Sequence, residues 1–316
     1  MKEIGGYFQL EQFKGEMLHQ DAIALNSGRN CLAYLIRSRK IEEILIPRFL
    51  CDSIEQVCRN ENIKVDYYSI DEKLLPCNIS LKDNQWLYFV NYYGQFSNEL
   101  IREVVDKYQR VIVDNVQAYF QSRIDGVDTI YTCRKFFGVP DGAFLYTDAK
   151  LTMNLEQDIS HERMSHVLGR FESSATEFYG KYSENEDVIS NLPLMRMSRL
   201  TENLLRGIDY QSIKEQRTKN FETIHSILKN ANILNVSVPN GAFMYPLYVH
   251  SGAKIRQELQ TKRIFIPTLW PDVFNICSEK ELEYDMAKNI LPIPIDQRYN
   301  EQDMKYIAEE ILKCIN

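Results

Sequence analysis

The first half of the chain alternates between short apolar runs and longer stretches with helical spacing. The runs are almost continuously apolar, which is typical of strands buried on both faces. Alternation of this kind predicts an α/β fold, in which helices cover both faces of a mostly parallel sheet. The predicted strands are 44–46, 65–70, 86–91, 111–113, 129–131 and 143–146, and the predicted helices are 31–37, 53–61 and 98–108.

The second half of the chain has a different pattern. Residues 151–230 are polar with helical spacing and contain few residues that would break a helix. Strand-like runs return at 242–249 and 264–267, and an amphipathic helix is expected at 301–314. We predict a large α/β domain at 1–210 and a smaller α+β domain at 211–316, with the boundary near Tyr210.

Composition narrows the class of protein. A net charge of −7 over 316 residues argues against nucleic-acid binding, which usually needs a basic face. No apolar run is long enough to span a bilayer, so no membrane contact is expected. The seven cysteines are scattered without a CxxC pair, which favours a reducing compartment and predicts a cytoplasmic location. His161 and His166 are five residues apart and do not share a helical face, so no metal site is predicted.

Lys135 and Asp114 carry the chemistry that a cofactor would need. Arg134 before Lys135, and Phe136 and Phe137 after it, would lower the pKa of its amine by charge repulsion and desolvation, which favours a Schiff base. Asp114 ends an apolar run, where an open α/β sheet places its ligand contacts. Together they predict a pyridoxal phosphate (PLP) site, with Lys135 on the aldehyde carbon and Asp114 on the ring nitrogen. Taken alone, the two residues also fit a surface lysine and an aspartate that caps a helix.

Five further residues are candidate contacts to the same cofactor. They are Ser27, Gly28, Arg29, Gln117 and Thr132. The first three precede a predicted helix, whose free N–H groups would favour a phosphate, although a plain capped helix explains them equally. The glutamine follows Asp114 by about one helical turn and either reaches the ring hydroxyl or is solvated. The threonine either donates its hydroxyl to the phosphate or is an ordinary β-branched strand residue.

The order and spacing of these segments resemble the DegT/DnrJ/StrS sugar aminotransferases, PLP-dependent enzymes with the aspartate aminotransferase fold (fold type I). Residues 24–29 are similar to the segment that opens the phosphate-binding helix of that family. Residues 113–118 resemble its Asp-x-x-Gln-Ala signature, and Lys135 takes the position of the Schiff-base lysine. The segments 44–47, 90–95, 195–198 and 216–217 also resemble family segments, in the same order.

The resemblance implies a fold and a function. The fold is a mostly parallel, seven-stranded-type sheet in a large domain, followed by a smaller C-terminal α+β domain. The function is amino transfer from a donor, expected to be glutamate, to a keto sugar, expected to be nucleotide-linked, in surface polysaccharide or amino-sugar biosynthesis. Lys135 and Asp114 would be catalytic, Gln117 would orient the ring hydroxyl, and the phosphate would be held by Ser27, Gly28, Arg29 and Thr132. Family members are generally homodimers with sites at the interface, so a homodimer is expected.

The chain departs from the family pattern at two positions. Cys51 stands where the family has an aromatic residue that stacks on the cofactor ring, so the ring contact is expected from Phe49 or Cys51. Leu194 stands where the family often has an asparagine that reaches the phosphate of the neighbouring subunit. Trp270 either lines the substrate entrance or packs in the small domain.

Two alternative functions stay open at this stage. The first is dehydration of a sugar on the same fold, but that branch typically has histidine in place of the lysine, so Lys135 counts against it. The second is a non-catalytic or regulatory protein that binds PLP or a sugar nucleotide without turnover. The missing aromatic residue at Cys51 and the apolar Leu194 favour this second reading, whereas Lys135 together with Asp114 favours an enzyme.

Overall fold

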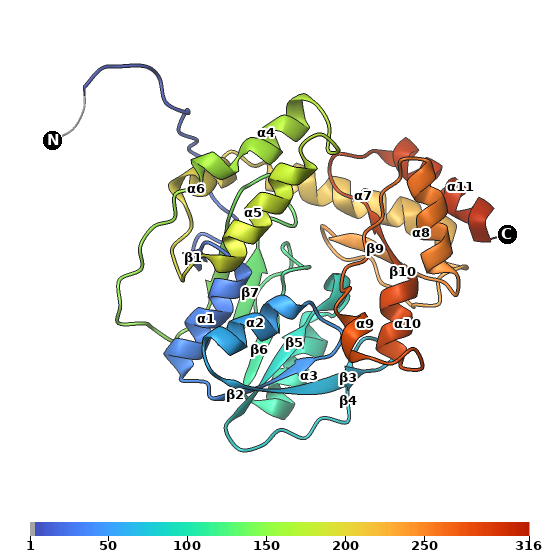
Figure 1. Cartoon of the computed structure of the whole chain (residues 1–316), viewed down its shortest axis with the longest axis horizontal. Coiled ribbons are helices and arrows are strands. Elements are labelled where there is room, and N and C mark those ends of the chain that lie inside the picture. The colour runs from blue at the N-terminus through green and yellow to red at the C-terminus, as the bar shows by residue number, and fades with distance from the viewer. Residues whose placement is uncertain (1–3, 316) are drawn as a thin grey trace.

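A central sheet of eight strands carries the fold of residues 4–315, the part of the chain that this computed structural model describes (Figure 1). The strand order is β1-β8-β7-β6-β5-β2-β3-β4. The run from β7 to β3 is parallel, whereas β8 pairs antiparallel with β7 and β1, and β4 with β3. The strands are β1 (Ile23–Leu25), β2 (Glu43–Pro47), β3 (Lys64–Ile70), β4 (Pro76–Cys77), β5 (Gln85–Val90), β6 (Val111–Asp114), β7 (Asp128–Thr132) and β8 (Ala143–Tyr146).

All six strands predicted in the first half are confirmed, and none of their ends is displaced by more than one residue. The central strand β6 is buried at all four of its residues, as expected for a parallel strand covered on both faces. The sheet has eight strands because β1 and β4 add to the six predicted ones. These two strands have three and two residues, too few to show a periodic pattern.

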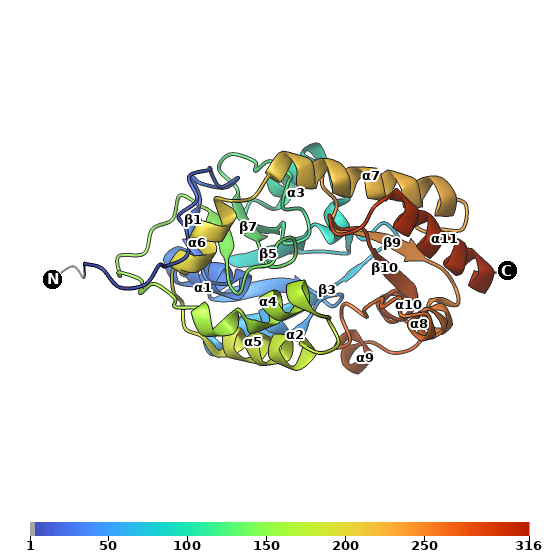
Figure 2. The same cartoon turned by 90° about the horizontal axis from the view of Figure 1, so that it is seen from above.

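The three helices predicted in the first half are also confirmed. They are α1 (Gly28–Arg39), α2 (Asp52–Asn60) and α3 (Asn98–Tyr108). The side chain of Ser27 caps α1 by accepting the Asn30 N–H at 3.2 Å, and Ser97 caps α3 by accepting the Leu100 N–H at 3.3 Å. Figure 2 shows α3 on one face of the sheet and α1 and α2 on the other, so the sheet is covered on both sides.

The region 151–230 is only partly helical. A helical hairpin is formed by α4 (Ser165–Glu172) and α5 (Tyr179–Asn191), and α6 (Arg199–Leu205) and α7 (Tyr210–Leu228) follow. The predicted helix over residues 151–164 is wrong, because part of this backbone pairs with another segment. Arg196 donates its N–H to Glu156 and accepts that of Asp158, at 2.8 and 3.0 Å. These bonds hold the chain extended.

The C-terminal part combines a two-stranded antiparallel sheet with helices. The strands are β9 (Met244–Tyr248) and β10 (Ile290–Pro294), and the helices are α8 (Gly252–Thr261), α9 (Val273–Ile276), α10 (Leu282–Asn289) and α11 (Glu301–Ile315). The predicted strand at 264–267 is wrong, since this segment is irregular. β10 was not predicted because it contains two prolines, which are tolerated here because a two-stranded sheet has only edge strands. The predicted domain boundary coincides with the start of α7, and the division into two domains stays a prediction.

Within residues 4–315, none of the helices has the combination of length and apolar character that crossing a membrane requires.

The loop that follows β7 is tied to α6 by a buried carboxylate. Asp141 is fully buried and accepts hydrogen bonds from the Ser198 N–H and hydroxyl, both at 2.7 Å, and from the Thr201 hydroxyl. Ser198 in turn caps α6 by accepting the Thr201 N–H at 3.1 Å. One side chain thus fixes both the helix and the loop.

Replacing Asp141 with alanine should lower the free energy of unfolding by about 3 kcal/mol, because buried donors would lose their acceptor. Chemical denaturation of Asp141→Ala measures this change. A suitable control is Asp125→Ala, whose side chain is 89% exposed and which should change stability by less than about 0.5 kcal/mol. Equal stability of the two variants would contradict the account of this loop.

Candidate active site

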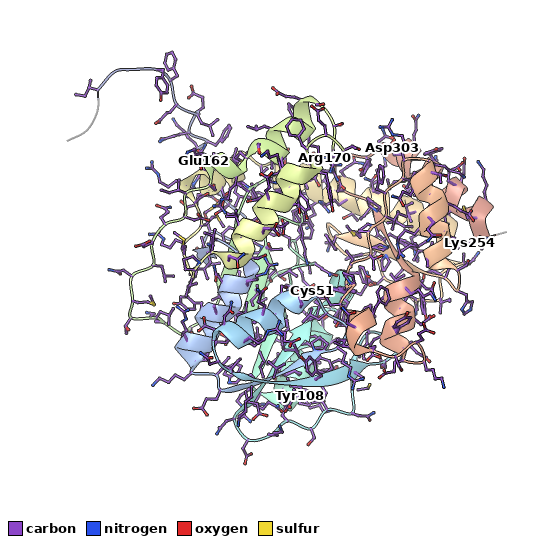
Figure 3. The ribbon with its side chains drawn as sticks, in the orientation of Figure 1. Cys51, Tyr108, Glu162, Arg170, Lys254 and Asp303 are labelled. Carbon is purple, nitrogen blue, oxygen red and sulfur yellow. The ribbon has the colours of Figure 1, made fainter. Side chains whose placement is uncertain are left out.

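The predicted catalytic residues meet at the carboxyl edge of the parallel strands. Asp114 ends β6, Lys135 lies in the turn after β7, and Cys51 follows β2. Parallel strands end on the same side of a sheet, which is where α/β proteins bind ligands. The charges of Asp114, Cys51 and Arg29 all affect the pKa of Lys135. Figure 3 shows Cys51 near the middle of the molecule, at the start of α2.

Lys135 has two features of a nucleophilic amine, which are access to a cavity and a lowered pKa. Its side chain is exposed, but the surface that it exposes faces a cavity. Burial beneath the walls of this cavity is the main cause that lowers the pKa of Lys135, and the charges of Arg29 and Arg134 lower it further. Asp114 and Cys51 act in the opposite direction. The predicted direction of the shift is therefore confirmed, with burial as its main cause and Arg134 as a minor one.

Asp114 is held by two hydrogen bonds and is 3% exposed. Its Oδ2 accepts from the Tyr88 hydroxyl at 2.8 Å, and its Oδ1 accepts from the Val116 N–H at 2.9 Å. Burial raises the pKa of Asp114, whereas Lys135 and the two donors lower it. Each carboxylate oxygen retains a lone pair that could accept a hydrogen bond from a ligand. Sequence reasoning missed Tyr88, and the available signal was a tyrosine in a buried strand, whose hydroxyl needs a partner.

Gln117 is oriented by the backbone. Its Oε1 accepts the N–H of Tyr93 at 2.6 Å, and Tyr93 has a positive φ of 55°. The side chain is 3% exposed, which excludes the solvated glutamine considered from sequence. Because the oxygen is used in this bond, the NH₂ group is what Gln117 can offer to a ligand oxygen. This fits the predicted contact to a ring hydroxyl, which stays a prediction.

The predicted phosphate contacts differ in what they can still donate. Ser27 caps α1, and a Cβ on Gly28 would make ordinary contacts with Val116 and Ile130, at 3.8 and 3.9 Å. The Nε of Arg29 is buried and has no hydrogen-bond partner. Thr132 donates its hydroxyl to the Gly142 carbonyl at 3.3 Å, so its proton is already used. The phosphate contacts of Ser27, Gly28, Arg29 and Thr132 stay predictions.

The two candidates for the ring contact occupy different environments. Phe49 is fully buried, and its ring centroid lies 4.4 Å from that of Trp270 and 5.5 Å from that of Tyr92. Cys51 is only partly buried and is among the groups that affect Lys135. The structure thus brings Cys51 to the site and places Phe49 in an aromatic core with Trp270, which is 5% exposed. Which residue faces a bound ring stays a prediction.

A cavity of about 620 Å³ opens beside Lys135. Its walls come from the turn after β7, the α4–α5 hairpin, α7 and the segment after β10. The lining is rich in cationic and aromatic side chains, including His166, Arg170, Tyr182, Arg217 and Arg298. Figure 3 shows Arg170 on α4. Such a lining suits an anionic ligand with ring groups.

The turn that carries Lys135 is anchored by the C-terminal part of the chain. The carbonyl of Phe136 accepts from Arg217 at 3.2 Å and from Gln297 at 2.8 Å. Arg217 is 2% exposed and also donates to Gln297 at 2.7 Å and to the Ala242 carbonyl at 3.0 Å. From the sequence, Arg217 was marked only by the family resemblance and Gln297 was not predicted, because neither lies near Lys135 in the chain.

The residues present fit pyridoxal phosphate. Lys135 supplies an amine with a lowered pKa, and Asp114 supplies a carboxylate at a strand end. Gln117 supplies an NH₂ group, and Arg29 supplies a buried Nε without a hydrogen-bond partner. These groups match an aldehyde, a ring nitrogen, a ring hydroxyl and a phosphate. Within the described residues, no three His, Cys, Asp or Glu side chains gather as a metal site.

Comparison with known proteins relates the fold to solved structures. No protein-family model matches the chain, and no curated protein matches its sequence. NtdA from Bacillus subtilis, with bound cofactor PMP, has a TM-score of 0.64 and 13% identity, over 92% of this chain and 72% of its own. A DegT DnrJ EryC1 StrS aminotransferase from Brucella abortus has a TM-score of 0.58 and 13% identity, over 92% of this chain and 85% of its own. DesI, solved in the presence of its TDP-sugar product, has a TM-score of 0.63 and 11% identity, over 93% of this chain and 80% of its own.

These structures define the class of fold. The chain has the fold of the PLP-dependent aminotransferases of fold type I, as expected from the sequence. Identities of 11–13% show the shared fold alone. What the chain does must therefore be argued from its own residues.

Asp114→Asn should lower the pKa of Lys135 further, because it removes a negative charge that raises that pKa. The asparagine keeps partners for the Val116 N–H and the Tyr88 hydroxyl, so the fold should persist. The measurement is the pH dependence of Lys135 acetylation in protein without cofactor, followed by mass spectrometry. The midpoint should move to lower pH in Asp114→Asn and stay in place in Asp148→Asn, whose side chain is 81% exposed. An unchanged midpoint in Asp114→Asn would contradict the coupling of the two charges.

Proposed function

We propose that this protein is a PLP-dependent aminotransferase that acts on a nucleotide-linked keto sugar. One observation carries the proposal: Lys135, with a lowered pKa, lies near the buried Asp114 at the edge of a sheet with the fold of sugar aminotransferases. The cavity beside Lys135 has about 620 Å³ and a cationic, aromatic lining, which suits a nucleotide-linked sugar. DesI, which shares the fold, was solved in the presence of its TDP-sugar product.

Each residue has a distinct role in this reaction. When bound, pyridoxal phosphate supplies a carbonyl carbon that reacts with amines and a ring that accepts electrons from the substrate. Lys135 would bind that carbon and, once displaced by the donor's amino group, its Nζ would carry the proton to and from the substrate carbon. Asp114 would keep a proton on the ring nitrogen, a charge-assisted bond worth about 1.5–3 kcal/mol. Gln117 would orient the ring hydroxyl through its NH₂ group.

Several finer parts of the proposal follow from the family resemblance. The amino donor is proposed to be glutamate, the protein a homodimer with sites at the interface, and the product an intermediate of surface polysaccharide or amino-sugar biosynthesis. A cytoplasmic location is supported by the seven cysteines, which all have free thiols.

The non-catalytic alternative is not favoured. A protein that only binds a ligand has little need for both an amine of lowered pKa and a buried acid beside it. Both are present here: Asp114 ends β6, Lys135 follows the neighbouring parallel strand β7, and the charge of Asp114 acts on the pKa of Lys135. Lys135 also counts against dehydration of a sugar, because the dehydrating branch typically has histidine at this position.

The test is an absorption spectrum of the protein with PLP, before and after addition of glutamate. The wild type should show a visible band of the covalently held cofactor, and glutamate should bleach it. Lys135→Ala should lack the band and lose at least about 10²-fold of the activity, since its proton carrier is gone. Lys150→Ala, an exposed lysine after β8, should behave as the wild type.

Two results would contradict the proposal. The first is a wild type with no band at saturating PLP, which would favour a protein that only binds its ligand. The second is a band of equal strength in Lys135→Ala, which would assign the chemistry to another residue.

A further inference from the structure

The N-terminal segment exposes apolar side chains that nothing in the same chain covers. Residues 4–10 read Ile-Gly-Gly-Tyr-Phe-Gln-Leu and contain no charged residue. Ile4, Tyr7 and Phe8 are 96%, 99% and 98% exposed. Single exposed apolar residues are common, but an uncharged run that exposes three large ones almost fully is typical of an interaction site. We refer to residues 4–10 as the arm.

The arm is anchored at its base and free along its length. Asn203 of α6 accepts the N–H of Phe13 at 3.0 Å and donates to the carbonyl of Glu11 at 2.8 Å. By contrast, none of residues 4–10 forms a hydrogen bond with another residue in the described part of the chain. The chain is thus held on α6 just before the exposed side chains begin.

The direction of the arm is set where it leaves the body of the molecule. Gly15 lies against the end of α6, because a Cβ on it would overlap the Arg206 carbonyl oxygen. Met17 and His19 are buried, and the ring of His19 is hydrogen-bonded to the Tyr119 carbonyl at 2.9 Å. Figures 1 and 2 both show the arm extending away from the helices and strands of its own chain. A cover for the arm therefore has to come from another molecule.

A second exposed apolar patch lies on the α4–α5 hairpin. Phe171, near the end of α4, is 91% exposed, and Tyr179, at the start of α5, is 67% exposed. Leu168 and Tyr182 of the same hairpin are 56% and 45% exposed. The three aromatic side chains also line the cavity beside Lys135. Whatever covers this patch therefore becomes part of the cavity wall.

We propose that the arm of one copy of this chain packs on the α4–α5 hairpin of a second copy, where its Tyr7 and Phe8 cover the cavity beside Lys135. In a two-fold dimer the exchange is mutual, because each copy lends one arm and receives one. A second copy thus covers both patches at once, whereas another protein would have to supply two different surfaces. The inference rests on the homodimer of the proposed function and names the segment that the two copies exchange.

The two patches match in chemistry and in size. Both consist mainly of aromatic side chains, which pack favourably against one another. The four most exposed rings of each copy belong to Tyr7, Phe8, Phe171 and Tyr179. Burying them at both exchanged contacts would remove on the order of 1,500 Å² from water, since each aromatic side chain carries about 150–250 Å². This is the size of a standard protein interface, so the contact is large enough for a stable dimer.

The direct test is photochemical cross-linking of the full-length protein with p-benzoylphenylalanine in place of Phe8. Irradiation should give a covalent species of twice the chain mass, and peptide mapping should find the cross-link within residues 165–182. The control carries the same photoreactive group in place of Tyr306, which is 50% exposed on α11, at the opposite end of the molecule from the arm (Figure 1). This control should give no such species. A cross-link within a single chain, or one outside the hairpin, would overturn the inference.

Substitutions test the two sides of the contact separately. Tyr7→Ser/Phe8→Ser alters the arm, and Phe171→Ser/Tyr179→Ser alters the hairpin. These side chains are largely exposed in the single chain, so both variants should keep the far-UV circular dichroism of the wild type. The dissociation constant of the dimer, measured by sedimentation equilibrium, should rise roughly 100-fold or more in each, because every lost aromatic anchor is lost twice in a two-fold dimer. Tyr306→Ser should leave it unchanged, and an unchanged constant in both double variants would overturn the inference.

A third measurement tests the place of the arm at the cavity. Acetylation of Lys135 in cofactor-free protein, followed by mass spectrometry, should be several-fold faster in Tyr7→Ser/Phe8→Ser than in the wild type, because the cavity loses its cover. Tyr306→Ser should react at the rate of the wild type. Equal rates in the arm variant and the wild type would contradict the assignment of the arm to the cavity.

The outcomes separate this inference from the proposed function. If PLP forms no covalent band but Phe8 cross-links to the hairpin of a second copy, the proposed function fails and the exchange of arms stands. If the band forms and glutamate bleaches it, but the cross-link stays within one chain, the proposed function stands and the inference is overturned. A wild type that stays monomeric at micromolar concentration would overturn both the homodimer and the exchange.

Discussion

The site depends on two ionisable groups, Asp114 and Lys135, that the protein shields from water at one edge of the sheet. Asp114 and Lys135 are each disfavoured in their charged form by burial, and each is favoured by the charge of the other. Neither charge would be as stable at its position alone. The parallel arrangement makes this pairing feasible, because β6 and β7 end on the same side of the sheet.

The position of Lys135 is also set by segments far from it in sequence. Arg217 and Gln297 hold the carbonyl that follows it, at 3.2 and 2.8 Å. On the other side, Arg134 pairs with Glu186, and the Pro140 carbonyl accepts from Asn185 at 3.0 Å, so α5 fixes the same turn. Because a nucleophile must be held within a small tolerance of its productive position, these contacts belong to the site as much as the amine does.

The strands were predictable from the sequence because they are buried on both faces and therefore continuously apolar. The position of Asp114 was predictable too, because it directly follows such an apolar run and therefore lies at the end of a buried strand. Strands without this signature were missed, as β10 shows with its two prolines. The predicted strand at 264–267 failed because an apolar run is equally compatible with an irregular buried segment.

The supporting residues of the site could not be predicted for a different reason. Tyr88 and Gln297 reach the site only through tertiary packing, and no local pattern marks either of them. The difference between Phe49 and Cys51 is of the same kind, since it depends on Trp270, which packs against the phenylalanine. Local propensity and periodicity give elements, whereas the partners of a buried polar group come from the whole fold.

The central claim is that Lys135 is the residue that binds the cofactor covalently. The most direct measurement is peptide mapping by mass spectrometry after borohydride reduction of the protein loaded with PLP. The account predicts a single modified peptide, in which the pyridoxyl group is on Lys135. Modification of another lysine, or of none, would contradict it.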